Sequence, residues 1–439
     1  MSRAQPELGK NGDLKNMIDY NTRLLYMMKV VGALSMRYRF RMKDTVDGDI
    51  LLRSVQSAMK RYPYLKKKIA VDNGTFVLQD NPLPVPVMKT SYPMPLFGSD
   101  EMNGHLLCVD YEEDCIYFTL LHNLGGGRGL LRWCLTVLYQ YVTDRYGTEP
   151  GWEGVRKPYE PCGPGEELIQ PFDKIPDDTP VLWPGFSPVI KPILPSALEN
   201  GLKGGGEEGF FRTTVTLDED RVIERVKACK ASPAVWFAVI YYRAIVSCLK
   251  EVPDYIDMGI ACDVSDRYGI SESMSLVTKF LHFVISGEDS KLDTEALCMK
   301  GRSMIKEQKD PGATDRLLIK ERDTLTEMDK LPTLEEKIQF YIKNSMIADM
   351  VPSALVSYVG KLDVPGMESY VADLILDSVS NRSGTVIFAQ NGRFFVSVLH
   401  GSENAPVIDA YLEELEKEGI KAEAVEKNRK QNNIGVVFP

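Results

Sequence analysis

Apolar and polar residues alternate with two different periods along this chain, and together the two periods predict a mixed α/β architecture. Residues 34–41 alternate as a half-buried strand does, and residues 65–71 and 75–78 predict a hairpin. Residues 47–63 place their apolar positions at helical spacing up to a closing proline. The first part of the chain therefore predicts strand, helix and hairpin in that order.

A second hairpin is predicted from residues 105–111 and 115–121, and its second strand is almost wholly apolar. Such a strand is typical of a sheet centre that is covered on both faces. The strand runs into the sequence HNLGGGRG at 122–129, and residues 130–141 then have the apolar stripe of an amphipathic helix. His122 is thus predicted at the C-terminal end of a central strand, just before a glycine-rich turn.

The order of elements starts again after a proline- and glycine-rich stretch. We predict an N-terminal lobe at 1–150, a crossover linker at 151–206 and a C-terminal lobe at 207–439. The second lobe is predicted to contain strands at 212–217, 258–264, 278–285, 355–358, 370–377, 384–390 and 393–400, and helices at 218–230, 234–249, 292–348 and 406–419.

Composition narrows the class of protein. A chain of 439 residues that is 44% apolar can bury a large core. Its net charge of −10 and its lack of a basic run argue against nucleic acid as a partner. A polar N-terminus and no apolar stretch of about 18 residues predict a cytoplasmic protein without integral membrane contact. The eight scattered cysteines read as reduced core residues, and four histidines in all leave little material for a metal site.

The candidate chemistry centres on His122. A neutral imidazole there can act as general base, whereas the alternative is a core histidine bonded to backbone. Gly125, Gly126 and Gly127 let the chain turn tightly and let a substrate approach the backbone, and their N–H groups can stabilise an oxyanion. The alternative for these glycines is a plain strand-to-helix turn.

Three segments together resemble a known superfamily. They are the helix and turn of residues 46–69, the strand and loop LLHNLGGGRG, and VSYVGKLDVPG at 356–366. In this order they resemble the condensation-domain and alcohol-acetyltransferase superfamily, whose fold is chloramphenicol-acetyltransferase-like. The second of them falls where that superfamily has His-His-x-x-x-Asp-Gly, with Leu121 in place of the first histidine and Gly126 in place of the aspartate.

The resemblance implies two similar α/β lobes that form a pseudo-dimer, with a tunnel between them and His122 near its midpoint. It implies an acyltransferase that moves an acyl group from a coenzyme A or acyl-carrier-protein thioester to a hydroxyl or amine of a small-molecule acceptor. The thioester is a co-substrate, and no cofactor is permanently bound. The alternatives are a catalytically inactive relative that binds a ligand or protein, and a stand-alone amide-forming condensation domain.

Three further residues enter through the resemblance. Ser357 and Tyr358 would lie near the tunnel and bind substrate through their hydroxyls, although both also fit ordinary strand positions. Arg267 lies near where the superfamily has the arginine that pairs with the motif aspartate. Because Gly126 removes that partner, and a buried unpaired guanidinium would cost about 3–5 kcal/mol, we expect Arg267 to be solvated or paired with an acid such as Asp263 or Asp266. A surface arginine is the alternative.

Overall fold

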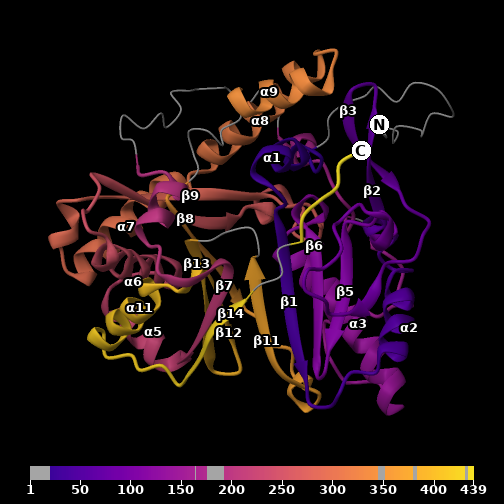
Figure 1. The fold of residues 1–439 in the computed structure, drawn as a ribbon, viewed down its shortest axis with the longest axis horizontal. Coiled ribbons are helices and arrows are strands. Elements are labelled where there is room, and N and C mark those ends of the chain that lie inside the picture. The colour runs from indigo at the N-terminus through magenta and orange to yellow at the C-terminus, as the bar shows by residue number, and fades with distance from the viewer. Residues whose placement is uncertain (1–19, 164, 176–191, 345–351, 379–382, 431–433) are drawn as a thin grey trace, which may run out of the picture.

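The computed structural model describes residues 20–163, 165–175, 192–344, 352–378, 383–430 and 434–439. Within them the chain forms two α/β lobes that lie side by side, each built on one mixed sheet (Figure 1). Apolar side chains from the second sheet, including Val386, Phe388 and Leu399, belong to the same buried cluster as the core of the first lobe. The predicted two-lobed α/β fold is therefore confirmed, and the lobes are packed against each other.

The first lobe contains a five-stranded sheet of order β11-β1-β6-β5-β4. Its strands are β1 (Ser35–Met42), β4 (Val87–Lys89), β5 (Leu107–Glu112), β6 (Cys115–Leu121) and β11 (Val371–Ser378). The separate hairpin is β2 (Lys67–Asp72) and β3 (Thr75–Asp80). β6 is buried along its whole length, as its apolar sequence predicts for a central strand.

The edge strand β11 comes from the second half of the chain. It pairs antiparallel with β1, with Met36 opposite Ser378. The stretch 207–439 is therefore not confined to one lobe, in contrast to the boundary predicted from the sequence. The exchange of this strand joins the two lobes through backbone hydrogen bonds.

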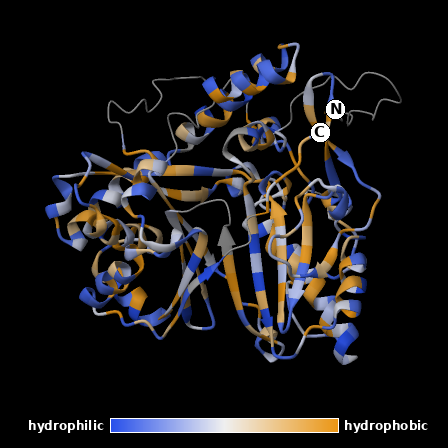
Figure 2. Cartoon of the chain, viewed as in Figure 1, coloured by the Kyte–Doolittle hydropathy of each residue, from blue (hydrophilic) through white to orange (hydrophobic). Residues whose placement is uncertain are grey.

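β1 alternates hydrophilic and hydrophobic residues along its length (Figure 2), and all of its residues except Arg41 are buried. Arg37 donates to both carboxylate oxygens of Asp110, at 3.0 and 2.7 Å, and to Thr119. Arg39 is paired with Glu426 of the second lobe at 2.9 Å. Buried cations need such partners, since an isolated buried charge is costly. Arg37 is thus paired inside the first lobe, whereas Arg39 pairs across the two lobes.

The second lobe contains a seven-stranded sheet of order β14-β7-β13-β12-β10-β8-β9. Its strands are β7 (Gly205–Asp218), β8 (Tyr255–Asp263), β9 (Thr278–Ser286), β10 (Ala354–Lys361), β12 (Ser383–Gln390), β13 (Arg393–Asn404) and β14 (Ala424–Lys430). α6 packs on this sheet and against α7 and α11, and its nearly all-apolar sequence is explained by this burial.

The helices follow capping signals that the sequence contains. Asp47 accepts hydrogen bonds from two N–H groups of the first turn of α2, and Ser232 caps α6. The helices are α1 (Arg23–Val31), α2 (Gly48–Ala58), α3 (Gly127–Tyr146), α4 (Pro195–Gly201), α5 (Glu219–Ala228), α6 (Pro233–Cys248), α7 (Thr294–Gln308), α8 (Pro311–Asp329), α9 (Leu334–Asn344) and α11 (Pro406–Lys417).

Some elements depart from the predictions. α4 lies inside the stretch predicted as linker and buries Leu198 completely, and β7 begins in its final glycines. The helical region 292–348 is divided into α7, α8 and α9, and its last residues, 345–348, lie outside the described part of the chain. Helix α1 and the short strands β4 and β14 were not predicted at all. α8 and α9 lie above the junction of the lobes, where α9 contacts α1 (Figure 1).

Candidate active site

His122 lies where β6 ends and a single 3-10 turn, η3 (His122–Leu124), begins. Its backbone N–H donates to the carbonyl of Leu34 at 2.8 Å, which holds the turn to the residue before β1. Its Nδ1 lies 3.2 Å from the carbonyl oxygen of Gly125. Since a carbonyl oxygen only accepts, Nδ1 must carry the proton of a neutral ring, and Nε2 then carries the lone pair.

The surroundings of His122 favour this neutral form. The side chain is partly exposed but is flanked by Leu121 and Leu124, both fully buried. Burial lowers the pKa of His122 from 6.5 to about 4, against a smaller opposing effect of the hydrogen bond to Gly125. At neutral pH the ring is therefore unprotonated, and no described residue has a hydrogen bond to Nε2 in the structure. A general base must be unprotonated at the working pH and must present a lone pair to the proton that it takes, and His122 meets both conditions.

The glycines after His122 allow a close approach of the second lobe. A Cβ atom on Gly125 would lie 2.8 Å from the carbonyl oxygen of Met274, and one on Gly129 would lie 2.6 Å from the Met274 sulfur. A Cβ on Gly126 would lie 3.1 Å from Cδ1 of Leu276. Real Cβ atoms do not tolerate the first two distances. The sequence explained these glycines by substrate approach or a tight turn, whereas the structure shows protein packed against them.

Two of the three N–H groups predicted for an oxyanion already have partners. Gly125 N–H donates to the carbonyl of His122 at 3.3 Å, and Gly126 N–H donates to the carbonyl of Met274 at 3.2 Å. Gly127 is the first residue of α3, where backbone N–H groups have no partner within the helix. Among the three glycines, only Gly127 keeps the donor that an oxyanion would need.

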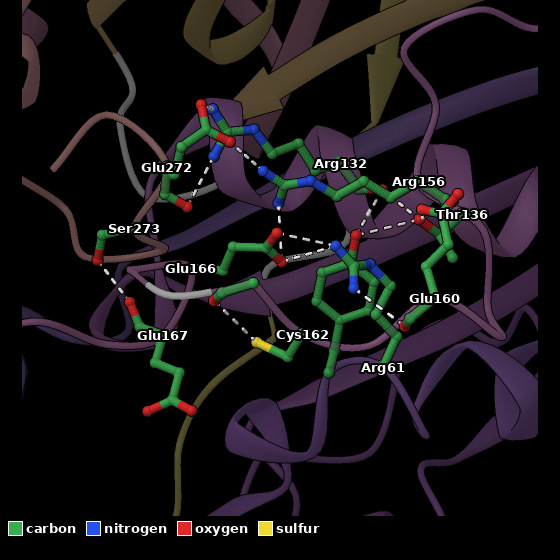
Figure 3. Close-up of polar contacts among 12 residues, drawn as sticks. Arg61, Arg132, Thr136, Arg156, Glu160, Cys162, Glu166, Glu167, Glu272 and Ser273 are labelled. Carbon is green, nitrogen blue, oxygen red and sulfur yellow. Dashed lines mark hydrogen bonds and ion pairs between the residues drawn. The ribbon is translucent and has the colours of Figure 1, made fainter.

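Residues 271–276, which we call the interlobe loop, connect η5 (Ser265–Tyr268) to β9 and lie against the start of α3 (Figure 3). Arg132 of α3 donates to the carbonyls of Ser271 and Glu272, at 2.9 and 2.8 Å. The Glu272 carboxylate pairs with Arg132 at 3.2 Å and with Arg156. Arg156 also lies 3.4 Å from Glu166. The loop of one lobe is thus bound to the helix of the other by charge-assisted hydrogen bonds.

Arg267 is paired, but not with the predicted acids. Its guanidinium donates to Asp315 of α8, with Nε 3.0 Å from one carboxylate oxygen, and this pairing raises the pKa of Arg267. Asp263 and Asp266 lie instead 3.8 and 3.7 Å from Arg128. The expectation of an acidic partner is confirmed, whereas the choice of partner was wrong. Because α8 and η5 are both in the second half of the chain, Arg267 does not link the lobes.

Ser357 and Tyr358 lie on opposite faces of β10. Ser357 is opposite Val386 in the register and shares the face of the second sheet that packs towards the first lobe. Tyr358 instead packs with Phe394 in the core of the second lobe, with ring centroids 6.2 Å apart, and burial raises its pKa. Of the two, only Ser357 faces the side on which a substrate between the lobes would lie.

The remaining three histidines are buried. His105 lies 2.9 Å from the carbonyl of Leu83 through Nε2, and His282 Nδ1 lies 2.5 Å from Asp257. His400 has both ring nitrogens engaged: Nδ1 with the carbonyl of Ser402 at 2.8 Å, and Nε2 with the hydroxyl of Thr213 at 3.2 Å. Burial lowers the pKa of His400, so this ring is neutral as well.

His400 is the counterpart of His122 in the second lobe. The hairpins β5–β6 and β12–β13 each have a two-residue turn, and the two histidines follow the start of the second strand by the same number of residues. Two positions before each histidine, the strand pairs with Met36 in the first lobe and with Thr213 in the second. In the second lobe the hydroxyl of Thr213 forms a hydrogen bond with Nε2 of His400. At the equivalent position the first lobe has Met36, whose side chain has no hydroxyl. The correspondence of His122 and His400 was not predicted from the sequence, although the equal lengths of the two hairpins could have indicated it.

His122 does not line either of the following two pockets, both of which are formed by described residues. One, of about 60 Å³, lies in the second lobe and is lined by residues that include Tyr241, His400 and Ser402. The other is open and lies between Asp218 and Gly419. The tunnel between the lobes therefore stays a prediction from the resemblance.

Two searches of the described residues bear on metal and membrane. No group of three or more His, Cys, Asp or Glu side chains there is arranged around a metal position. No helix there is by itself both long and apolar enough to cross a bilayer; α5 and α6 reach that length and composition only together, across an 88° bend.

The arrangement defines a class of protein: the chain has the two-lobed fold of the condensation-domain and chloramphenicol-acetyltransferase-like acyltransferases. It is similar to the epimerization domain from the third module of tyrocidine synthetase B, with 11% identity over 93% of this chain and 97% of that one, at a TM-score of 0.59. It is also similar to the TRI3 trichothecene 15-O-acetyltransferase of Fusarium sporotrichioides, with 11% identity over 92% and 94% of the chains and a TM-score of 0.56.

A third similar structure is F. graminearum TRI101 complexed with coenzyme A and T-2 mycotoxin, with 11% identity over 92% of this chain and 99% of that one, at a TM-score of 0.56. No model of a known protein family and no curated protein matches the sequence. At these identities the likeness establishes the fold, and the chemistry has to be argued from the site.

Proposed function

We propose that this protein is an acyltransferase that uses Nε2 of His122 as general base. The observation that carries the proposal is the open Nε2: Nδ1–H donates to Gly125, so a neutral ring presents its lone pair at Nε2, to which no described residue has a hydrogen bond. The corresponding histidine of the second lobe, His400, has both nitrogens engaged. The fold of known acyl- and acetyltransferases supports the same reaction class.

In the proposed reaction, a hydroxyl or amine of the acceptor gives its proton to Nε2 as its oxygen or nitrogen attacks the thioester carbonyl. The tetrahedral intermediate then expels the thiolate as the C–S bond breaks, and the imidazolium returns the proton to that sulfur. The products are the acylated acceptor and a free thiol. General base assistance of this kind typically contributes about 10²–10⁴-fold.

The donor we propose is a coenzyme A or acyl-carrier-protein thioester, and the acceptor a small molecule with a hydroxyl or amine. The coenzyme A complex of TRI101 is consistent with the first donor. Ser357 is the residue of the predicted pair that we retain as a substrate contact. We propose a cytoplasmic location and no nucleic-acid partner, both on the composition of the sequence alone.

The second candidate is a catalytically inactive protein that binds a ligand or partner. Gly126 in place of the motif aspartate favours this alternative. A stand-alone amide-forming condensation domain differs from the main proposal only in its acceptor.

The experiment that tests the proposal follows thiol release from acetyl-coenzyme A and from longer acyl-coenzyme A donors, each with a panel of alcohols and amines. We expect acceptor-dependent release in the wild type and a loss of about 10²-fold or more in His122→Ala. His105→Ala is the matched control, because its ring lies in the same lobe and contacts the carbonyl of Leu83. Equal rates in His122→Ala and the wild type would remove the base role, and no release with any pair would favour the binding protein.

A further inference from the structure

We infer that Met274 and Leu276 of the interlobe loop are the positioning residues for His122, in the place where the resemblance would put an aspartate. This inference deepens the proposed function, since it names the residues that act through the base. Its basis is the packing of the loop against the turn, which stands whatever reaction the protein performs.

The first step is the closeness of the contact. The loop lies so near that Gly125 and Gly129 have no room for a Cβ, and the backbone joins the two segments through Gly126 N–H and the Met274 carbonyl. Gly125 is also the residue whose carbonyl fixes the His122 ring. A shift of the interlobe loop would therefore be transmitted through Gly125 to the His122 ring.

The second step is that the interlobe loop is itself held firmly. Ser273 Oγ donates to the carbonyl of Glu167 at 2.5 Å, and Ser275 Oγ donates to the carbonyl of Ile169 at 2.8 Å. Met274 N–H also donates to the Glu167 carbonyl, at 3.2 Å. On its other side the loop is bound by Arg132 and Arg156, which both pair with the Glu272 carboxylate (Figure 3). A loop anchored on two sides can fix the position of a turn that it touches.

The third step is that the pair between a motif aspartate and an arginine, which the resemblance would place here, is absent. Position 126 has no side chain, and Arg267 is paired with Asp315 inside the second half of the chain. The space that a side chain at 126 would take is occupied by Leu276. A Cβ at position 126 would press on Cδ1 of Leu276 at 3.1 Å, so volume added at residue 126 must either displace Leu276 or be offset by a loss of volume there.

This contact gives a volume-conserving test. Gly126 has φ −92° and ψ 176°, a conformation that valine adopts readily, so Gly126→Val adds three carbons without backbone strain. Leu276→Ala removes three carbons from the same place. Volume-conserving exchanges are tolerated best in packed regions, whereas overpacking displaces neighbours. The single variant should displace the loop and the double variant should restore it.

The measurement is the rate at which diethyl pyrocarbonate modifies each histidine at neutral pH, read by peptide mass spectrometry. The chain has four histidines, so His122 is observed directly and the three buried ones are internal standards. We expect Gly126→Val to change the His122 rate by about fivefold or more, and Gly126→Val with Leu276→Ala to return it to within about twofold of the wild type. Gly151→Val, where nothing lies within 4 Å of the added Cβ, is the matched control.

An unchanged His122 rate in Gly126→Val, or a double variant no closer to the wild type than the single one, would overturn the inference. A change in all four histidines would also overturn it, because the variant would then act on the whole fold. The outcome is separate from that of the enzymatic proposal: if His122→Ala leaves thiol release intact while the double variant restores labelling, the base role fails and the positioning role stands.

Discussion

The decrease in the free energy of unfolding at acid pH measures how strongly the surroundings of His122 disfavour its protonated, charged form. The perturbation is His122→Asn, chosen because the asparagine amide can still donate a hydrogen bond to the Gly125 carbonyl, whereas it does not titrate. The quantity compared is the free energy of unfolding of the wild type and of the variant as a function of pH.

The magnitude follows from proton linkage. His122 has a pKa of about 4 in the folded chain, against 6.5 for an unperturbed histidine. As the pH falls through 6.5 the unfolded chain binds a proton that the folded chain does not bind, so the free energy of unfolding decreases down to about pH 4. This single site accounts for about 1 kcal/mol between pH 7.5 and 5.5 and about 3 kcal/mol once both forms are protonated.

The assay is urea unfolding of both proteins at about pH 7.5, 6.5 and 5.5. Burial lowers the pKa of His105 and His400 as well, but both residues are present in both proteins and cancel in the difference. We expect the wild type to lose about 1 kcal/mol more than His122→Asn over this range. Parallel losses would mean that the folded chain protonates His122 as easily as water-exposed histidine, which would refute the argument for a desolvated base.

Three other predictions use the same structure. Asp110→Asn leaves Arg37 buried without its carboxylate and should lower the free energy of unfolding by about 3–5 kcal/mol in urea titrations; a change below about 1 kcal/mol would contradict the pair's burial. Arg267→Ala removes a partly exposed pair with Asp315, so we expect a cost of about 1 kcal/mol or less and unchanged diethyl pyrocarbonate labelling of the proposed base; faster labelling would show that the pair does position it. Met36→Thr should lower thiol release about tenfold or more, because the threonine hydroxyl can donate a hydrogen bond to Nε2 of His122. Met36→Leu adds no donor and should retain thiol release, so equal rates in the two variants would contradict this explanation.

Elements with a local signal could be predicted from the sequence. The alternation of residues 34–41 became β1, and the aspartate before the apolar stripe became the cap of α2. The position of His122 at the end of a fully buried strand was also predictable, because an unbroken apolar run that stops at a glycine-rich turn is typical of a central strand. These features depend on residues that are close together in the chain.

Features that depend on distant residues were not predictable in this way. β11 reads as an ordinary strand, and nothing in its sequence indicates that it pairs with β1 across the lobes. The partner of Arg267 lies on α8, whereas two nearer acids in the sequence were the obvious choices. The glycines were explained by a substrate or by a tight strand-to-helix turn, and their packing against Met274 and Leu276 was not predicted because these two residues lie far along the chain. A sequence shows which residues are small without showing what lies against them.

The two lobes provide an internal comparison that bears on the chemistry. Both place a neutral histidine seven residues after the start of the second hairpin strand, and in both Nδ1–H donates to a nearby backbone carbonyl, so neither the residue nor its tautomer separates the two sites. They differ at Nε2: the hydroxyl of Thr213 forms a hydrogen bond with Nε2 of His400, whereas no described residue does so with Nε2 of His122. We therefore expect the open Nε2 lone pair, and not the histidine itself, to set the site of His122 apart in the proposed reaction. A search for histidines alone would find four candidates, whereas an accepting Nε2 on a partly exposed ring selects one.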